Sequence, residues 1–390
     1  MKPHYFATCA RGLEPILARE LTALGASDVA PGRGGVAFVG EPVVVYQASL
    51  WLRTAVRILR PIFEGEVRST DELYHAVRTL DWSEYLTPEL TLAVDCNVRD
   101  SAITHSQYAA RRVKDAICDQ FRDKYGRRPS VDTERPAIGL NLHISLDQAT
   151  LSLDASWDSL HKRGYRPIQT RAPLNEALAA GLLLQIGYDG TVPLIDPLCG
   201  SGTFAIEAAW IAMNRPPGLT RKWFAFFGWP DFDAGLWSAV RDDARRKVKP
   251  RPDVVIGGSD VRGDAIDFAW ANAKAAGVGH AVGFQKLDVI DARPPDGPPG
   301  ILICNPPYGE RLGEEADLEP LYRDIGGTIR DHWSGWRLAM FTANPRLARQ
   351  VPLKADRSTA FFNGSLTCRL LEYRPYERRN WPAPAELPHE

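Results

Sequence analysis

The sequence predicts an α/β protein in which a Rossmann-like domain with a mostly parallel, seven-stranded sheet follows smaller α+β modules. The 390 residues are enough for two or three domains. Short apolar runs alternate with helical stretches after residue 160, which is typical of a parallel sheet. A glycine-rich turn directly follows the first of those runs, as in doubly wound folds that bind a nucleotide.

The first 155 residues predict the α+β modules. Some stretches repeat apolar residues with a helical period, and others alternate them with polar residues as strands do. We expect helices at 14–24, 44–59, 71–77 and 106–125. We expect strands at 5–8, 36–39, 62–67, 91–98, 138–145 and 148–154.

The second part of the chain predicts the seven-stranded sheet. Its first strands are expected at 192–196, 254–260, 282–288, 301–305 and 338–343. Helices are expected between them at 204–214, 264–276 and 318–333. Two closing strands, 359–362 and 367–373, are near enough in sequence to form a hairpin, so we expect the sheet to end with an antiparallel edge strand.

Composition excludes several classes of protein. Lys and Arg number 47 and Asp and Glu 48, so any binding of nucleic acid must come from local basic patches. The cysteines form no C-x-x-C pair and no cluster with histidine, so we expect neither a disulfide framework nor a metal site. No apolar run reaches the roughly 18–20 residues of a membrane span, and the first residues lack a signal-peptide core. We therefore expect a cytoplasmic protein with no membrane partner.

The turn DPLCGSGT at 196–203 is the first candidate site. Glycines at the carboxyl end of a first strand let a ligand approach the backbone closely. The turn lacks the G-x-G-x-x-G pattern and the lysine of a phosphate-binding loop, which disfavours dinucleotides and nucleoside triphosphates. A nucleotide-like cofactor is therefore expected, with a tight turn that binds nothing as the alternative. The cofactor-binding candidates are Asp196, Cys199, Gly200, Ser201, Gly202 and Thr203.

Two further acids end the next strands. Asp260 closes the expected strand 254–260, where a carboxylate accepts hydrogen bonds from both ribose hydroxyls. Asp260 lies 64 residues after Asp196, whereas a plain strand–helix–strand unit needs about 20, so we expect an insertion at 215–252. Its many Phe and Trp residues favour a local packing cluster over a base-stacking platform. Asp288 ends the third strand and is a candidate for the adenine amine.

The most specific signal is NPPYGERL at 305–312, just past a strand. An exocyclic nucleobase amine is a poor nucleophile because its lone pair is delocalised into the ring. The Asn305 side-chain carbonyl and the Pro306 backbone carbonyl can accept its two N–H bonds, while Pro306 and Pro307 rigidify the turn and leave Tyr308 to stack on the base. Asn305 to Tyr308 are thus the catalytic candidates, and Asn305 also borders the cofactor. A proline turn with a surface tyrosine is the alternative.

These motifs together resemble those of S-adenosylmethionine-dependent RNA methyltransferases with an N-terminal THUMP domain. The resemblance extends through FATCARGLE at 6–14, SQYA at 106–109, VKDAI at 113–117 and LHKRGYR at 160–166, and so covers nearly the whole chain. It is strongest with the guanine-N2 methyltransferase half of bacterial 23S ribosomal RNA enzymes. In many bacteria that half is fused to a second methyltransferase, which makes 7-methylguanosine. This chain ends at Glu390, so we expect that second activity to be absent.

The resemblance implies the domain order and the roles of the candidates. It implies a ferredoxin-like segment at 1–43, a THUMP RNA-binding domain at 44–155, a linker at 156–190, a methyltransferase domain at 191–380 and a tail at 381–390. Asp196 and residues 199–202 would line the methionine side of S-adenosylmethionine, Asp260 would bind its ribose and Asp288 its adenine. Residues 305–308 would hold the target base. Cys199 and Cys304 lack the carboxylate motif of a covalent cysteine mechanism, which disfavours that mechanism.

A basic stretch is the candidate RNA surface. Between residues 111 and 128, seven basic residues against three aspartates leave a net charge of +4. A solvated helix face with partly cancelling charge pairs is the alternative, and the family resemblance favours RNA phosphates. The RNA-binding candidates are Arg111, Arg112, Lys114, Arg127 and Arg128 there, together with Lys162, Arg163 and Arg166 after it.

We therefore expect an RNA methyltransferase that transfers a methyl group from S-adenosylmethionine to the exocyclic N2 amine of a guanine in 23S ribosomal RNA. The target base must leave its helix or come from an exposed loop. A transfer RNA guanine-N2 enzyme and an adenine-N6 methyltransferase are alternatives within the class. A non-catalytic RNA-binding assembly factor is an alternative from another class. A NAD-dependent oxidoreductase is disfavoured by the missing G-x-G-x-x-G pattern.

Overall fold

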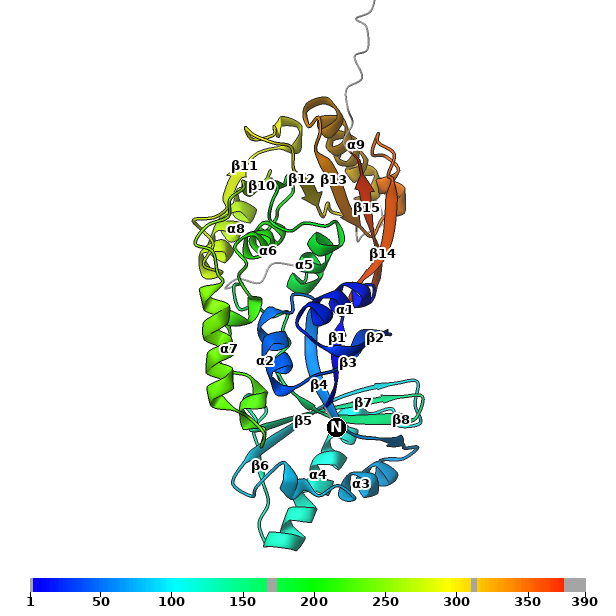
Figure 1. Cartoon of the computed structure of the whole chain (residues 1–390). Coiled ribbons are helices and arrows are strands. Elements are labelled where there is room, and N and C mark those ends of the chain that lie inside the picture. Colours follow the sequence, from blue (N-terminus) through cyan, green and yellow to red (C-terminus); the bar gives the residue numbers. More distant parts are fainter. Residues whose placement is uncertain (1–2, 167–173, 310–313, 375–390) are drawn as a thin grey trace, which may run out of the picture. The chain divides into compact units, whose positions relative to one another are not determined.

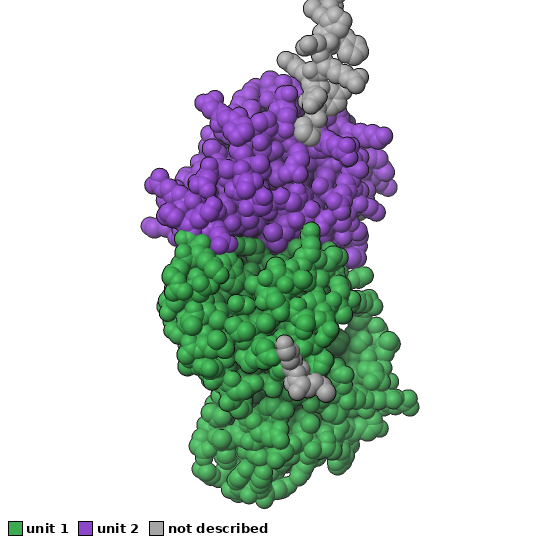
Figure 2. All heavy atoms as spheres, viewed as in Figure 1, with its two compact units in different colours: residues 1–163, 215–248 green, residues 164–214, 249–390 purple. Residues whose placement is uncertain are grey.

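The computed structural model describes residues 3–166, 174–309 and 314–374. The chain divides into two compact units, which Figure 2 colours separately. Unit 1 contains Met1–Arg163 and Arg215–Val248, and unit 2 contains Gly164–Asn214 and Lys249–Glu390. Within the described ranges, no helix has both the length and the apolar character needed to cross a membrane.

Unit 1 is built on an eight-stranded mixed sheet in the order β2-β3-β1-β4-β8-β7-β5-β6 (Figure 1). The strands are β1 (His4–Cys9), β2 (Ser27–Gly32), β3 (Gly35–Val39), β4 (Ala55–Glu66), β5 (Thr91–Arg99), β6 (Ser130–Val131), β7 (Ile138–Ser145) and β8 (Gln148–Asp154). The helices are α1 (Glu14–Ala23), α2 (Pro42–Trp51), α3 (Thr70–Arg78) and α4 (Ser106–Tyr125), with a short 3-10 turn at Trp82–Glu84. Strand β4 joins the two halves of the sheet because it pairs antiparallel with β1 and with β8.

Local caps determine where helix α3 begins and where helix α4 ends in the predicted THUMP region. Ser69 Oγ accepts the Glu72 N–H at 3.1 Å, and the Glu72 carboxylate accepts the Arg68 N–H at 2.7 Å, so α3 begins with paired caps. Helix α4 ends where Gly126 adopts a φ of 67°, which a residue without Cβ does at little cost. The predicted helix at 106–125 is confirmed.

The prediction of a helix at 44–59 is wrong for the second half of that range. Helix α2 ends at Trp51, and β4 begins at Ala55. The carboxylate of Glu20, on α1, accepts the backbone N–H groups of Arg53 and Thr54 at 2.8 and 3.2 Å. A distant side chain therefore satisfies donors that a continuing helix would have bonded to its own carbonyls. Strand β2 is a second difference, since no strand was expected there.

The expected insertion at 215–252 was placed within the 191–380 domain, but Arg215–Val248 clusters with unit 1. This segment carries two 3-10 turns (Pro217–Thr220 and Ala225–Gly228) and the helix α7 (Ala234–Arg246). Phe226 is fully buried and stacks on Tyr46 of α2 with ring centroids 4.9 Å apart, and Trp237 packs edge-on to both rings. The aromatic residues thus form a packing cluster in unit 1.

Unit 2 contains a seven-stranded sheet in the order β11-β10-β9-β12-β13-β15-β14, which confirms the predicted fold class (Figure 1). Its strands are β9 (Leu194–Asp196), β10 (Ile256–Asp260), β11 (Gly283–Lys286), β12 (Ile301–Cys304), β13 (Arg337–Thr342), β14 (Arg357–Asn363) and β15 (Leu366–Tyr373). The first five are mutually parallel. Strand β15 pairs antiparallel with β13 and with the edge strand β14.

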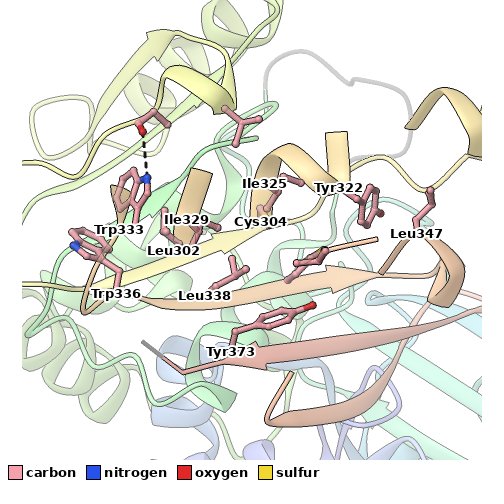
Figure 3. Packing of buried hydrophobic residues seen from close by; sticks show 14 residues of the cluster. Leu302, Cys304, Tyr322, Ile325, Ile329, Trp333, Trp336, Leu338, Leu347 and Tyr373 are labelled. Atoms are coloured by element: carbon pink, nitrogen blue, oxygen red, sulfur yellow. Dashed lines mark hydrogen bonds between the residues drawn. The ribbon is translucent and has the colours of Figure 1, made fainter. Parts of the chain in front are cut away.

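The helices of unit 2 lie before and between its strands in the sequence. They are α5 (Glu176–Gln185), α6 (Thr203–Ala212), α8 (Gly263–Ala275), α9 (Glu314–His332) and α10 (Pro345–Ala348), with a 3-10 turn at Val289–Asp291. One core cluster packs α9 against β12, β13 and β15, and Figure 3 shows Cys304, Tyr322, Leu338 and Tyr373 within it. Because the parallel strands β9, β10, β11 and β12 end at the same edge of the sheet, the residues that follow them meet there.

Candidate active site

The glycine-rich turn is held by backbone bonds to the neighbouring strand. Cys199 N–H donates to the Ser259 carbonyl at 2.8 Å, and Gly202 N–H donates back to the Cys199 carbonyl at 2.8 Å. Gly200 and Gly202 have φ values of 51° and 80°, which a side chain would oppose. A Cβ on Gly202 would lie 2.8 Å from the Phe284 ring, so the turn also needs glycine there for close packing.

Asp196 ends β9 and is almost fully enclosed. The residue is only 2 % exposed, and its side-chain oxygen Oδ1 accepts the Leu198 N–H at 3.1 Å. Burial is the largest effect on this carboxyl group and raises its pKa from 3.8 to about 8, with a smaller contribution from the charge of Asp260. Asp196 therefore holds a proton over much of the neutral range when no ligand is present.

Asp260 ties the second strand to the turn. One oxygen accepts the Gly200 N–H at 3.0 Å and the other accepts the Arg262 N–H at 3.0 Å. Each carboxylate oxygen has a second lone pair, so two hydroxyl donors can still be accepted. Asp260 pairs in register with Lys286 of β11, and the exposed Asp288 follows two residues later. The three acids thus lie at the ends of, or just beyond, three adjacent strands.

Asn305 follows β12, whose last residue, Cys304, is fully buried. The Asn305 side-chain oxygen is enclosed and has no hydrogen-bond partner in the described part of the chain. Burial also raises the thiol pKa values of Cys304 and Cys199, so neither thiol is activated as a nucleophile. The structure therefore brings Asn305, Asp196, Asp260 and the glycine-rich turn to one edge of the sheet, because each lies at or just beyond the carboxyl end of a parallel strand.

Sequence reasoning missed one buried residue behind the turn. Asn272, on α8, is 2 % exposed, and its side-chain amide donates to the Ser201 carbonyl at 3.0 Å. This hydrogen bond holds the peptide group between Ser201 and Gly202 in place. An asparagine inside an otherwise apolar helix face was the available signal, because such a side chain needs a polar partner when buried.

A glycine-rich turn and acidic residues at the ends of parallel strands are typical of enzymes that bind a nucleotide-like cofactor. Comparison with known protein families shows which enzymes these are. The RMKL-like methyltransferase domain matches residues 163–372. The chain belongs to this family. A THUMP domain matches residues 67–154, and the RlmL ferredoxin-like domain matches residues 4–59. The predicted resemblance to THUMP-containing methyltransferases is confirmed.

Several similar proteins carry methyltransferase names. Ribosomal RNA large subunit methyltransferase K/L of Syntrophotalea carbinolica is 45% identical over 98% of this chain and 55% of its own length. A putative RNA methyltransferase of Synechocystis sp. is 42% identical over 95% of this chain and 97% of its own length. The chain thus spans about half of the first relative and nearly all of the second.

A solved structure supports the same family. SMU.472, a putative methyltransferase crystallised in complex with SAH, is 32% identical, covers 97% of this chain and 99% of its own chain, and superposes with a TM-score of 0.86. The agreement over nearly the whole length includes the N-terminal modules as well as the methyltransferase domain.

Two of the predicted RNA-binding residues of this RMKL-like methyltransferase, Arg163 and Arg166, bond to other residues of the chain. Arg163 is 3 % exposed, and its guanidinium donates to the backbone carbonyls of Leu160, at 2.6 Å, and Arg53. Arg166 donates to Thr203 Oγ1 at 2.9 Å and lies 3.4 Å from the Glu176 carboxylate. Arg163 is therefore enclosed by its own unit and no longer expected to reach RNA, and Arg166 braces the start of α6. Lys162 remains exposed.

The basic residues of α4 and the turn after it are largely ion-paired within the THUMP region. Arg111 is exposed, and no ion pair of its side chain occurs among the described residues. The pairs that do form are Arg112 with Asp71 at 2.7 Å, Lys114 with Asp115 at 2.5 Å, Arg122 with Asp119 at 2.8 Å, Lys124 with Asp81 at 3.5 Å and Arg127 with Glu89 at 2.7 Å. RNA binding by this face stays a prediction. No group of metal-ligating side chains occurs in the described ranges.

Proposed function

We propose that this chain methylates the exocyclic N2 amine of a guanine in 23S ribosomal RNA, with S-adenosylmethionine as the methyl donor. The observation that carries the proposal is the side-chain oxygen of Asn305, which is enclosed, has no hydrogen-bond partner among the described residues and lies at the edge where the glycine-rich turn lies. A buried carbonyl oxygen without a donor is costly, and an amine of the substrate is a partner of the right chemistry. The choice of ribosomal RNA rests on the names of the longer K/L relatives.

The residues of the turn fit S-adenosylmethionine. The bound SAH of SMU.472, a relative similar over nearly the whole chain, supports the same cofactor here. When bound, S-adenosylmethionine supplies a methyl group on a positively charged sulfur. Gly200, where an added Cβ would have no atom within 4 Å, leaves the turn open to it. Asp260 accepts from its ribose hydroxyls, and Asp196 lines its methionine side. The adenine contact of Asp288 is part of the same proposal.

The loop after β12 handles the target base in this proposal. Asn305 Oδ1 and the Pro306 carbonyl accept the two N–H bonds of the amine, which localises its lone pair toward the methyl group. Tyr308 stacks on the base and holds it out of its helix. In this proposal catalysis comes mainly from alignment of the amine with the methyl group. The amine nitrogen bonds the methyl carbon as the carbon–sulfur bond breaks with its electrons left on sulfur, and the methylated nitrogen then releases one proton to water.

An Asn305→Ala variant tests this role. If Asn305 acts mainly in the transition state, turnover falls by roughly 100-fold while cofactor affinity stays within about twofold of wild type. The assay follows radiolabelled methyl transfer to transcribed 23S ribosomal RNA, with calorimetry for the cofactor. Near-normal turnover in Asn305→Ala would remove this residue from the mechanism.

The chemistry of Asn305 is the same for any exocyclic amine, so the product decides between the candidate activities. Nucleosides from ribosomal and transfer RNA of a deletion strain are separated by mass spectrometry. We expect loss of N2-methylguanosine from 23S ribosomal RNA and its return with the wild-type chain. Loss of N6-methyladenosine would indicate an adenine-N6 methyltransferase, and loss of N2-methylguanosine from transfer RNA alone would indicate a transfer RNA enzyme. If no methylated nucleoside is lost and no methyl transfer occurs in vitro, a non-catalytic factor is favoured.

A further inference from the structure

Buried side chains from other elements hold two consecutive carbonyls of the loop at 305–309. The Pro307 carbonyl accepts the hydroxyl of Tyr322, on α9, at 3.2 Å. The Tyr308 carbonyl accepts the side-chain amide of Asn344, between β13 and α10, at 3.2 Å. Neither Tyr322 nor Asn344 belongs to the sequence motif that they contact.

A third side chain, Thr342, connects these two contacts. The Tyr322 hydroxyl has one proton, which it donates to the Pro307 carbonyl, so it accepts from Thr342 Oγ1 at 3.0 Å. Thr342 Oγ1 in turn accepts the Asn344 N–H at 3.1 Å. Burial raises the pKa of Tyr322, which keeps the hydroxyl protonated and donating. The result is one ordered chain of hydrogen bonds from Asn344 to Pro307.

The held carbonyls belong to the two peptide groups on either side of Tyr308. The hydrogen bond to the Pro307 carbonyl restrains the peptide plane before Tyr308, and the hydrogen bond to the Tyr308 carbonyl restrains the plane after it. Because peptide groups are planar, restraining both planes limits φ and ψ of Tyr308 and so the direction of its Cα–Cβ bond. Tyr308 and Asn344 also line the same cavity of about 560 Å³.

The holding residues have little freedom to follow the loop. Tyr322 is fully buried in the core cluster of Figure 3, and Thr342 and Asn344 are 2 and 8 % exposed. Asn344 Oδ1 accepts the N–H groups of Arg346 and Leu347 at 2.9 and 3.1 Å and so caps α10. Its amide nitrogen also donates to the Glu315 carboxylate at 2.9 Å.

We propose that Tyr322, Thr342 and Asn344 are positioning residues that set the orientation of Tyr308 against the target base. The proposal rests on the proposed function for what Tyr308 touches, whereas the hold on the loop backbone does not depend on the substrate. An alternative is that the three residues only stabilise the fold. The two readings differ in whether the effect of each residue passes through Tyr308.

A double-mutant cycle separates these readings in the full-length chain. Tyr322→Phe keeps the ring in the core and removes only the hydroxyl. We expect kcat for methylation of transcribed 23S ribosomal RNA to fall about tenfold, with cofactor affinity unchanged, in line with one lost orienting hydrogen bond. In a Tyr308→Ala background the same substitution should change kcat by less than about twofold, because the ring it orients is gone. Equal losses in both backgrounds would overturn the proposal.

A matched control is Tyr373→Phe, which removes a hydroxyl from a tyrosine of the same core cluster on β15. It should leave kcat near wild type, and a tenfold loss there would show that the effect is a general one of the core. Asn344→Ser offers a second variant, since serine can cap α10 but cannot reach the Tyr308 carbonyl. We expect its kcat to fall as that of Tyr322→Phe does, and a normal kcat would remove Asn344 from the proposal.

Amide hydrogen exchange supplies a readout that does not require the proposed activity. Peptides covering residues 305–309 should exchange at least several-fold faster in Tyr322→Phe than in wild type, with no change in Tyr373→Phe. Unchanged exchange of the loop would overturn the positioning role. If the wild type methylates no RNA but the exchange difference is present, the proposed function fails and the hold on the loop stands.

Discussion

At the residue scale, Asp196 makes the stability of unit 2 dependent on pH. Its pKa is raised from 3.8 to about 8 by burial, so the folded chain keeps a proton that the unfolded chain releases between those values. The stability contributed by this group is fully present below about pH 4 and is lost as pH rises to about 8. Asparagine has no carboxyl group to titrate. We therefore expect the midpoint temperature of thermal unfolding of Asp196→Asn to rise relative to that of wild type as pH increases from about 5 to 8.

Thermal unfolding without ligand at several pH values measures this difference. Asp288→Asn is the matched control, since it removes an exposed carboxyl group beyond the neighbouring strand β11. A difference between Asp196→Asn and wild type that stays constant with pH would show that the folded chain holds no extra proton there.

Asp260 carries the prediction on cofactor binding. If Asp260 accepts from the ribose hydroxyls as proposed, Asp260→Ala removes charge-assisted hydrogen bonds worth roughly 1.5–3 kcal/mol each, so S-adenosylmethionine should bind at least tenfold more weakly. The variant also frees the Gly200 N–H, which Asp260 accepts in the structure. Asp260→Asn keeps an acceptor for that N–H and therefore isolates the lost charge. Unchanged calorimetric affinity in both folded variants would end the ribose assignment.

At the element scale, the junction between α2 and β4 depends on one carboxylate from α1. Glu20 accepts the N–H groups of Arg53 and Thr54 and the Thr54 hydroxyl. Glu20→Ala removes the acceptor of these three donors, so we expect a loss of roughly 2–4 kcal/mol in unfolding free energy. Chemical denaturation followed by far-UV circular dichroism measures it. Arg19→Ala, an exposed neighbour on the same helix, is the control, and an equal loss there would contradict the assigned role.

The same junction shows where sequence reasoning succeeds and fails. The bounds of α4 could be predicted because its apolar period and Gly126 lie within the segment itself. The strand ends at Asp196 and Asp260, and the one just before Asn305, were predictable for the same local reason. The end of α2 was not, because Glu20 is more than 30 residues away in sequence. The hold of Tyr322 and Asn344 on the loop was likewise hidden, since it depends on packing between distant elements.

At the scale of the whole molecule, a net charge of −1 means that RNA affinity has to come from a local surface. A pocket that grips one flipped base buries too little to choose a site among thousands of guanines, so selectivity requires contacts elsewhere. The basic residues on and just after α4, in the matched THUMP region, are the candidates. Exposed ion pairs such as Arg127 with Glu89 contribute little to stability and can be exchanged for phosphate contacts.

Reversal of Arg111, Arg112, Arg127 and Arg128 to glutamate tests this surface. Each lost phosphate contact lowers the slope of log affinity against log salt by roughly 0.7–0.9, so four should flatten it by about 3. Affinity for S-adenosylmethionine should not change, because the turn lies in unit 2. The matched control reverses four exposed cations at the end of α7 and beyond, with the same change in net charge: Arg245, Arg246, Lys247 and Lys249. If both variants bind transcribed 23S ribosomal RNA with the same salt slope, the α4 residues are an ordinary solvated face and RNA recognition lies on another surface.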